Sequence, residues 1–306
     1  MTTALAEPLF QDNPYLEGVL SFDKRGREKG IFGLLRKARE VRSMGFDRAY
    51  SIHKSYRTAL LLAFARIPLR IGFAESALSF LYHKRIARPR ASHEVLRSLS
   101  ILGPEATVSI MESFGELQLT AEPLDSLSKE LQGRISLVSE KGYAVLVPGS
   151  VWATKRWTVA GYTRLARLIK ERLQLDVVIG GAPNEVSMGD LVAEGSGALN
   201  LTGKTSLKEF LTLIAHAKLV VCNDSMALHV ASAFKIPTVA IFCATSPSFG
   251  FGPWRNRGVV VERADLSCKP CSPHGGPTCP TGTEACMRGV EVETVFKAAK
   301  EVLQYL

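Results

Sequence analysis

The clearest pattern of hydrophobic and polar positions lies in the second half of the chain, where short apolar runs alternate with amphipathic stretches. The runs are continuously apolar, which is typical of strands buried on both faces of a parallel sheet. The amphipathic stretches place apolar side chains at helical spacing, as at Tyr162, Leu165 and Ile169. The pattern predicts strands over 143–147, 176–179, 198–201, 219–222 and 238–242, and helices over 159–173, 185–194, 207–217 and 225–234.

The first half shows the same alternation less regularly. It predicts strands over 18–22, 47–52 and 69–73, helices over 31–44, 57–66 and 94–102, and, at the end of the chain, a helix over 292–305. Alternating strands and helices predict an α/β fold, here as two domains of parallel sheet facing a cleft. The polar stretch 131–141 separates the two patterns, so we expect an N-terminal domain over 1–135 and a C-terminal domain over 140–306.

The length and composition fit a two-domain globular protein. The 306 residues are 46% hydrophobic and 22% charged, which excludes a disordered or collagen-like chain. The net charge of +9 favours an anionic partner, such as nucleic acid, a phosphorylated substrate or an acidic membrane surface. The apolar run 59–65 is shorter than the ~20 residues of a membrane span, and the start lacks the basic and apolar regions of a signal peptide. We therefore expect a cytoplasmic protein.

The loop 148–157, PGSVWATKRW, is the first candidate for chemistry because it joins a predicted strand to a predicted helix. Ligands of open parallel sheets bind at the carboxyl ends of the strands, which is where this loop lies. Gly149 and Ser150 allow close backbone approach, and Lys155 and Arg156 supply positive charge. Such a loop can hold a diphosphate without a metal. The alternative interpretation is a solvated basic loop, with Trp157 packed on the next helix.

Two further predicted strand ends carry polar groups. In 222–229, Asp224 or Ser225 is suited to cap the helix that follows, whose first N–H groups can bind an anion, and His229 lies one turn further on. The alternative is ordinary capping with a histidine in the core. The turn 243–248 is rich in hydroxyl groups. Because the three loops follow strands of one predicted sheet, the set is more specific than any one of them.

Several motifs are absent from the sequence. It has no Gly-x-Gly-x-x-Gly and no P-loop, which argues against a standard dinucleotide or ATP site. It has no Asp-x-Asp pair of the kind that holds a metal-bound sugar nucleotide, and no Gly-x-Ser-x-Gly turn. Its aromatic and basic residues do not interleave as a stacking surface for single strands requires, so we expect no nucleic-acid partner.

Together, the loop PGSVWATKRW, the segment CNDSMALHVASAFKIPTVAIFCATSP and the tail CKPCSPHGGPTCPTGTEACM resemble glycosyltransferase family nine. These are the ADP-heptose:lipopolysaccharide heptosyltransferases of Gram-negative bacteria. The Lys-Arg-Trp form of the loop is most similar to the heptosyltransferase II branch of the family. The resemblance runs from about Glu7 to the end of the chain and is strongest over 143–288.

The resemblance implies a GT-B fold with two Rossmann-like domains, of which the C-terminal one binds the donor and the N-terminal one the acceptor. It implies inverting transfer of heptose from ADP-heptose to an inner-core heptose of lipopolysaccharide at the inner membrane surface. We expect a monomer that needs no cofactor. Lys155 is then expected to stabilise the leaving group. The donor-binding residues implied are Ser150, Lys155, Arg156, Glu185, Asp224, Ser225 and His229. In the N-terminal domain, the basic helix 31–44 and the side chains of Lys54, Arg57 and Arg70 are candidate contacts for the acceptor or for a membrane surface, and the alternative for each is a solvated face.

The sequence departs from the family pattern at several positions. Val151 replaces a hydroxyl residue, Met226 stands where the family usually has Gly, and Cys243-Ala244 replaces Gly-Pro. The family's opening strand and Ser-x-Gly-Asp turn, whose Asp is its proposed general base, have no counterpart before the segment 8–15, so the general base is not assigned. The same letters at 187–190 fall inside a predicted helix. We expect the missing strand to leave an open sheet edge.

Two alternatives to heptose transfer remain at this point. One is a GT-B transferase that uses a different nucleotide-sugar donor. The other is a catalytically impaired protein that still binds a nucleotide sugar, because the general-base motif is missing.

Four of the six cysteines lie close together, at Cys268, Cys271, Cys279 and Cys286, with His274 among them. This C-x₂-C-x₇-C-x₆-C spacing is compatible with a structural zinc site or an iron–sulfur cluster. The alternative is four free thiols in a loop stiffened by proline, as is usual in a reducing cytosol.

Overall fold

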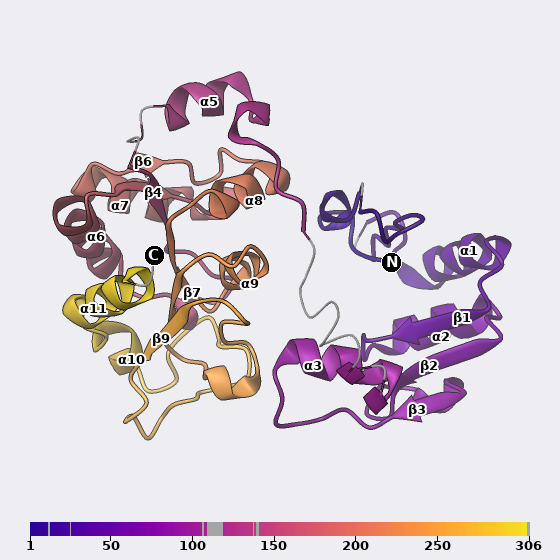
Figure 1. Cartoon of the computed structure of the whole chain (residues 1–306). Helices are drawn as coiled ribbons and strands as arrows, with labels where there is room; N and C mark the ends of the chain where they lie inside the picture. The colour runs from indigo at the N-terminus through magenta and orange to yellow at the C-terminus, as the bar shows by residue number, and fades with distance from the viewer. Residues whose placement is uncertain are drawn as a thin grey trace. The chain divides into compact units, whose positions relative to one another are not determined.

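The structure is a computed structural model that describes residues 1–304 except 12, 25, 106, 109–118, 137 and 139–140. It divides into two compact units, Met1–Leu117 and Gln118–Leu306, which we call unit 1 and unit 2 and describe separately. Strands alternate with helices in both units, and every strand pairing is parallel, as the sequence predicts (Figure 1).

Unit 2 is built on a six-stranded sheet whose first strand in the chain, β4, lies in the middle. The strand order is β6-β5-β4-β7-β8-β9. The chain moves outward from β4 to β6 and then returns to the other side of β4, where β7 pairs with it. The strands are β4 (Tyr143–Val147), β5 (Asp176–Ile179), β6 (Leu199–Asn200), β7 (Leu219–Asn223), β8 (Thr238–Phe242) and β9 (Gly258–Glu262). This order places a topological switch point between β4 and β7.

Helices cover both faces of this sheet, with α6 and α11 on one side and α8 and α9 on the other (Figure 1). Every residue of β4, β7 and β8 is buried, which explains why these strands are continuous apolar runs. The helices of the unit are α5 (Lys129–Ile135), α6 (Val159–Leu168) with a π-helical continuation over Ile169–Leu173, α7 (Val186–Ser196), α8 (Leu207–Ala215), α9 (Met226–Ala233), α10 (Ala285–Arg288) and α11 (Val292–Leu303).

Unit 1 has a smaller sheet of three described strands in the order β1-β2-β3. The strands are β1 (Arg48–Ser51), β2 (Leu69–Phe73) and β3 (Lys84–Ile86), and the helices are α1 (Gly30–Ser43), α2 (Tyr56–Phe64) and α3 (Glu94–Leu99). A core that includes Phe22, Leu34, Leu61 and Tyr82 joins α1 to α2 and the sheet. Among the described strands β1 pairs only with β2, so it forms an edge, and a hollow of about 620 Å³ lies beside it.

The structure corrects three predictions about the elements. The expected strand over 18–22 is wrong, because only an isolated bridge joins Thr2 to Ser21 there. The strands β3 and β9 were missed: β3 has only three residues, and no helix of the predicted alternation separates β9 from β8. The last helix ends at Leu303, and residue 305 lies outside the described part.

The division between the units falls earlier than the predicted stretch 131–141, part of which is not described. Residues before α5 belong to unit 2, where the Ser128 N–H donates to the Glu209 carboxylate and Lys208 pairs with Glu122. The polar composition of 131–141 resembles a linker, but these contacts tie the segment before it to α8. Among the described helices of both units, none is long and apolar enough to cross a membrane.

Candidate functional site

The carboxyl ends of β4 and β7 lie side by side at the switch point of unit 2, and the loops that leave them are joined by one buried side chain. Asn223, which is fully buried, donates from Nδ2 to the carbonyls of Pro148 (2.8 Å) and Gly149 (3.3 Å). Its Oδ1 accepts a hydrogen bond from the Trp157 N–H at 3.0 Å. Both ends of the basic loop 148–157 are therefore fixed to the end of β7.

Lys155 and Asp224 meet within this frame. The Lys155 ammonium lies 2.7 Å from Asp224 Oδ2, and only 15% and 9% of the two side chains are exposed. Thr245, in the loop after β8, donates its hydroxyl to the same carboxylate oxygen at 2.8 Å. Residues from three strand ends thus meet at the Asp224 carboxylate, which holds the Lys155 ammonium in place.

Ser150 and Arg156 reinforce the loop. Ser150 donates its hydroxyl to the Asp224 carbonyl at 3.1 Å, and Arg156 Nε donates to the Ser150 carbonyl at 2.9 Å. Both predicted site residues therefore lie beside Lys155, although the hydrogen bonds they make here are within the loop and to β7.

Glu185 comes from the loop after β5 and reaches the same edge. Its Oε2 accepts a hydrogen bond from the Ala182 N–H at 2.8 Å. A Cβ atom added to Gly149 would lie 2.0 Å from the Glu185 carboxyl carbon, so a larger residue at this position would displace the Glu185 carboxylate. The carboxylate therefore lies directly against the loop that carries Lys155.

Ser225 occupies the N-cap position of α9, as predicted, but its side chain makes no capping hydrogen bond. Its Oγ is buried and has no hydrogen-bond partner. An unpaired buried hydroxyl costs stability, and it lies where the first N–H groups of a helix are open to an anion. Ser225 and the start of α9 thus offer donors next to the Lys155–Asp224 pair.

Two of the positions where the sequence departs from the family pattern are exposed, whereas Cys243 and Ala244 are buried. Val151 is 85% exposed and Met226 is 49% exposed, so neither is packed in the core. His229 is also exposed, with its ring edge-on to Phe251 at 6.2 Å, and the alternative of a core histidine is wrong. None of the hydrogen bonds or ion pairs described for Lys155, Asp224 or Glu185 includes His229.

The cysteine-containing loop packs onto these loops. The Thr154 side chain exchanges hydrogen bonds with the Gly276 backbone, at 3.0 Å to its carbonyl and 2.8 Å from its N–H. The Ala244 N–H donates to the Thr154 carbonyl, and the Cys271 N–H donates to the Ala244 carbonyl. The segment around 271–276 therefore fixes the loops after β4 and β8 to each other.

Metal binding by the four cysteines of that segment stays a prediction. In the described part of the chain, no group of three or more His, Cys, Asp and Glu side chains is placed to hold a metal. Cys286, a residue of α10, is buried in the core, whereas Cys279 bonds to the Thr281 hydroxyl and Cys271 donates to the Cys268 carbonyl. The hydrogen bond with Thr281 is the main reason why the pKa of Cys279 falls to about 7.

The two cysteines at the strand ends are structural. Burial raises the pKa of Cys222, and nearby Asp224 raises it further. Burial also raises the pKa of Cys243, against the opposing effect of Lys269. Both thiols therefore stay protonated near neutral pH and are unsuited to act as nucleophiles.

The predicted acceptor contacts lie in unit 1. Lys54 is exposed. Arg57 donates to the Glu28 carbonyl at 3.1 Å, and Arg70 donates to the carbonyls of Leu81 and Ile67 at 2.9 and 2.6 Å. Arg57 and Arg70 therefore support the local fold of unit 1, and their predicted role in acceptor binding stays a prediction.

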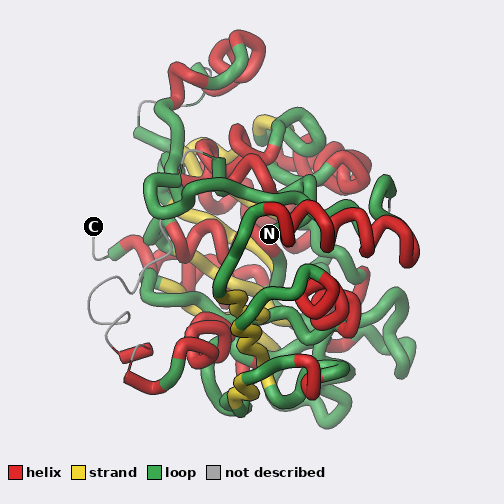
Figure 2. Tube along the Cα trace, turned by 90° about the vertical axis from the view of Figure 1, so that its right-hand side faces the viewer, coloured by secondary structure: helices red, strands yellow, loops and turns green. Residues whose placement is uncertain are grey.

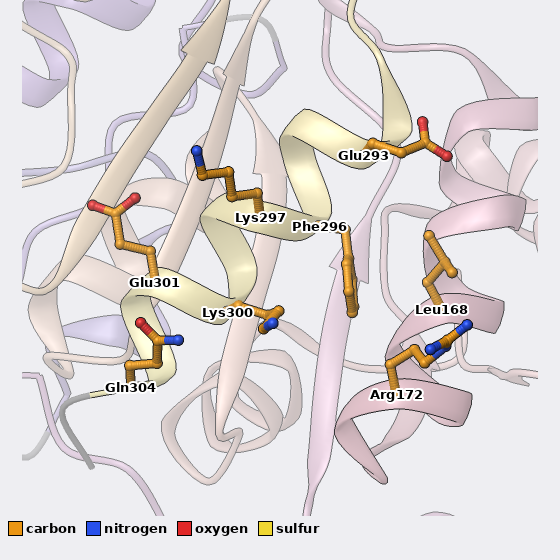
Figure 3. Close-up of a pocket in the computed structure, with 8 residues that line it drawn as sticks. All are labelled: Leu168, Arg172, Glu293, Phe296, Lys297, Lys300, Glu301 and Gln304. Atoms are coloured by element: carbon orange, nitrogen blue, oxygen red, sulfur yellow. The ribbon is translucent and has the colours of Figure 1, made fainter.

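A separate hollow of about 740 Å³ lies between α6 and α11 of unit 2 (Figure 3). Phe296 and Leu168 line it and pack against the core, beside the charged residues Arg172, Lys297 and Lys300. No residue of the loops after β4, β5, β7 or β8 lines it, so it is distinct from the candidate site.

Sequence reasoning missed Asn223 as a functional residue and gave Thr245 no specific role. The available signal for Asn223 was its position as the first polar residue after the apolar run 219–222. Its partners lie 66–75 positions away in the chain, so only the structure identifies them.

A parallel sheet with a cation and open helix N–H groups at its switch point is typical of an α/β protein that binds a phosphate-bearing ligand. The family model of glycosyltransferase family 9 (heptosyltransferase) matches residues 34–278. The chain therefore belongs to glycosyltransferase family 9 and is a glycosyltransferase.

Two relatives indicate how far the likeness extends. The chain is 25% identical over 304 residues to lipooligosaccharide heptosyltransferase 2 of Campylobacter jejuni, covering 97% of this chain and 85% of that one. It is 30% identical over 234 residues to lipopolysaccharide heptosyltransferase 2 of Escherichia coli K12, covering 68% and 63%.

Solved structures support the fold. A family 9 glycosyltransferase from Veillonella parvula matches with a TM-score of 0.84 and 23% identity, over 100% of this chain and 88% of that one. The E. coli ADP-heptose lps heptosyltransferase II matches with a TM-score of 0.73 and 22% identity, over 99% and 88%. The predicted GT-B fold is confirmed, and the cleft between the units stays a prediction.

Proposed function

We propose that this glycosyltransferase transfers heptose from ADP-heptose to the inner core of lipopolysaccharide, with inversion at the anomeric carbon. The observation that carries the proposal is the cluster at the switch point of unit 2, where Lys155, held by Asp224 at 2.7 Å, lies beside the unpartnered Ser225 hydroxyl. The names of the relatives, which are heptosyltransferases of lipopolysaccharide and lipooligosaccharide, support the choice of sugar and acceptor.

In the proposed reaction, an acceptor hydroxyl oxygen attacks the anomeric carbon of the donor. The bond from that carbon to the diphosphate oxygen breaks, and ADP leaves with the bonding electrons. Lys155 and the first N–H groups of α9 stabilise the negative charge that develops on the diphosphate. A carboxylate is expected to take the acceptor proton, and no residue is assigned to that role.

The other donor residues have more distant roles in the proposal. Ser150 and Arg156 shape the diphosphate loop, and Glu185, which lies against Gly149, contacts the nucleoside. His229, exposed on α9, contacts the donor from the side of that helix. No metal or other cofactor is needed, because the charge compensation comes from Lys155 and the helix N–H groups.

The proposal places the acceptor on unit 1. Lys54 is exposed, and Arg57 follows it at the start of α2, so both can meet the anionic groups of the lipopolysaccharide core. The reaction then takes place at the cytoplasmic face of the inner membrane, by a monomer.

The test is a transfer assay with purified protein, ADP-heptose and lipopolysaccharide whose core ends at its first heptose. We expect ADP release that depends on the acceptor and a product heavier by one heptose in the mass spectrum. Addition of EDTA should leave the rate unchanged. UDP- and GDP-sugars, tested in parallel, should not support transfer.

Each outcome decides between the hypotheses. Transfer from a UDP- or GDP-sugar in preference to ADP-heptose replaces the proposal with a GT-B transferase of different donor specificity. ADP-heptose binding by calorimetry without any ADP release supports the catalytically impaired nucleotide-sugar binder instead. Loss of activity with EDTA contradicts the metal-free mechanism.

A further inference from the structure

The exposed hydrophobic side chains of the protein are concentrated in unit 1. Among the described residues, fourteen of the eighteen large hydrophobic side chains that are exposed belong to Met1–Leu117, although that unit is the smaller one. The most exposed of the fourteen in unit 1 is Phe32, at 84%, and its neighbour Ile31 is 51% exposed. Contiguous exposed apolar groups mark interaction sites more often than single ones do.

The positive charge of the chain is concentrated in the same unit. Between residues 24 and 97 the sequence has 18 Lys and Arg against 5 Asp and Glu. The whole chain has 38 against 29, so this segment alone accounts for the net positive charge of the protein. The apolar and the basic features therefore occur together.

Helix α1 combines the two features on one face. Its inner face, with Leu34, Ala38 and Val41, is buried in the core of unit 1. Its outer face has Ile31 and Phe32 in the first turn, followed at helical spacing by exposed Arg36, Arg39 and Arg42. Figures 1 and 2 both show α1 on the outside of unit 1.

The three arginines have no acidic partner within the described part of the chain. Arg36 donates to the Arg27 carbonyl, and none of the three is in an ion pair described for this structure. The one acidic residue of the helix, Glu40, is paired with the buried Lys37 at 2.8 Å. The outer face of α1 therefore presents positive charge that no acidic side chain of the described residues compensates.

We propose that the outer face of α1 docks unit 1 onto a bilayer that contains anionic lipid headgroups. A helix that combines exposed apolar residues with an unpaired basic face is suited to lie in the headgroup region of a bilayer, with its apolar residues inserted at the level of the headgroups. Phe32 and Ile31 insert, and the three arginines contact lipid phosphates. The proposed function enters this inference at one point only. It supplies the role of the membrane contact, which is to hold the enzyme beside a lipid-linked acceptor.

The test is flotation of the purified full chain with vesicles of phosphatidylethanolamine and phosphatidylglycerol, and with vesicles of phosphatidylcholine alone. We expect the wild type to float with the anionic vesicles only, and less at high salt. The substitutions Arg36→Ala, Arg39→Ala and Arg42→Ala together should lower partitioning by about fivefold for each arginine removed. The pair Ile31→Ser and Phe32→Ser should lower it by about tenfold.

Matched controls separate this face from the general positive charge of the protein. Arg164→Ala, Arg167→Ala and Arg172→Ala remove the same charge from the exposed side of α6 and its continuation in unit 2. Phe80→Ser removes a side chain of unit 1 that is 71% exposed but lies outside α1. Both variants should float as the wild type does, and Phe32→Trp should retain binding because tryptophan also favours the membrane interface.

The proposal is overturned if the wild type does not float with anionic vesicles, or if the α6 variant loses as much binding as the α1 variant. Equal loss in Phe80→Ser overturns the assignment to α1. Equal flotation of the wild type and the α1 variants would also contradict the proposal. It would be the result expected if the α1 face binds an acidic protein and not lipid. ADP binding by calorimetry should be the same in the α1 variants and in the wild type, because the candidate donor site lies in unit 2. A lack of ADP binding in the wild type would therefore count against the proposed function and not against this inference.

Discussion

The two units are both parallel α/β layers, yet they differ in where their polar groups are satisfied. In unit 2 the loops at the carboxyl ends of the strands are bonded to one another through Asn223, Thr245 and Thr154. In unit 1 the charged side chains are mostly on the surface, and several, such as Arg39 and Arg42 on α1, have no acidic partner in the described structure.

The difference indicates two kinds of anion recognition in one chain. A small rigid ligand needs fixed donors in a buried frame, because each donor must be in place before binding. Binding to an extended and mobile surface, such as a membrane, requires many charges but no fixed arrangement of one charge relative to another. Substitutions in the frame of unit 2 should therefore change donor affinity and leave vesicle binding intact, and substitutions on α1 should do the reverse.

The largest effect is expected from Lys155→Ala. If the lysine neutralises charge on the leaving diphosphate, transfer should slow by about 100-fold or more, and the dissociation constant for ADP should rise. The variant also leaves Asp224 without its cation, so thermal unfolding should be measured alongside. Lys170→Ala, which removes an exposed lysine bonded to the Gly197 carbonyl, is the matched control. Unchanged ADP affinity by calorimetry would contradict the assignment.

A smaller effect is expected from Asn223→Ala. It leaves two carbonyls and one N–H without their partner, so we expect a loss of about 2–4 kcal/mol in the free energy of unfolding. Donor affinity should fall by about tenfold, because the loop that carries Lys155 is no longer fixed.

Asn200→Ala is the control for this prediction, since Asn200 makes side-chain hydrogen bonds at the edge strand β6, with Asp190 and the Thr202 N–H. Its effect should be confined to stability. If Asn223 positions the loop for donor binding, the donor KM should rise in Asn223→Ala. A loss of stability with an unchanged KM would show that the role of Asn223 is structural only.

Thr245→Val should have a still smaller effect. It removes the hydroxyl that donates to Asp224 at 2.8 Å and keeps the shape of the side chain. We expect ADP affinity to fall by about fivefold, which corresponds to the net value of one typical hydrogen bond. Thr245→Ser should restore it. Thr212→Val, at another buried threonine of unit 2, should leave ADP affinity unchanged.

The smallest effect concerns pH and lies in unit 1. Burial, and then the charge of Lys24, lower the pKa of His53 from its ordinary value of 6.5. The unfolded chain then binds the proton more readily than the folded one, so unit 1 should lose stability as the pH falls below about 6.5. Melting curves from circular dichroism at about pH 7.5 and about pH 5.5 measure this loss.

His53→Gln should reduce that pH dependence, and His83→Gln, at an exposed histidine of the same unit, should not. An equal pH dependence in His53→Gln and the wild type would show that other groups cause it.

The sequence predicts unit 2 well because its buried strands are continuous apolar runs that end at glycine, proline or a polar turn. The rule that ligands bind at carboxyl ends then selects Ser150, Lys155, Asp224 and Ser225 without knowledge of the fold, and the structure brings these residues together. Edge strands such as β3 and β9 are shorter or partly exposed, so their pattern is weak.

What the sequence could not predict are contacts between side chains and distant backbone. The hydrogen bonds of Asn223 join the end of β7 to the loop 148–157, and these two segments are adjacent only after the sheet has formed. Ser225 shows the opposite limit, because its residue type predicts a cap, yet its hydroxyl makes no capping bond. Local preference fixes the position of the residue, and the surrounding fold decides which hydrogen bond it makes.

The burial of Trp157 gives the protein a built-in optical reporter. All three tryptophans, Trp152, Trp157 and Trp254, belong to unit 2, and Trp157 is 2% exposed with its indole N–H bonded to the Val290 carbonyl at 3.0 Å. Indole emission on heating therefore follows the melting of unit 2 alone, and the loss of structure in unit 1 does not change it directly. A second optical signal that both units share would then separate their unfolding without any label or substitution.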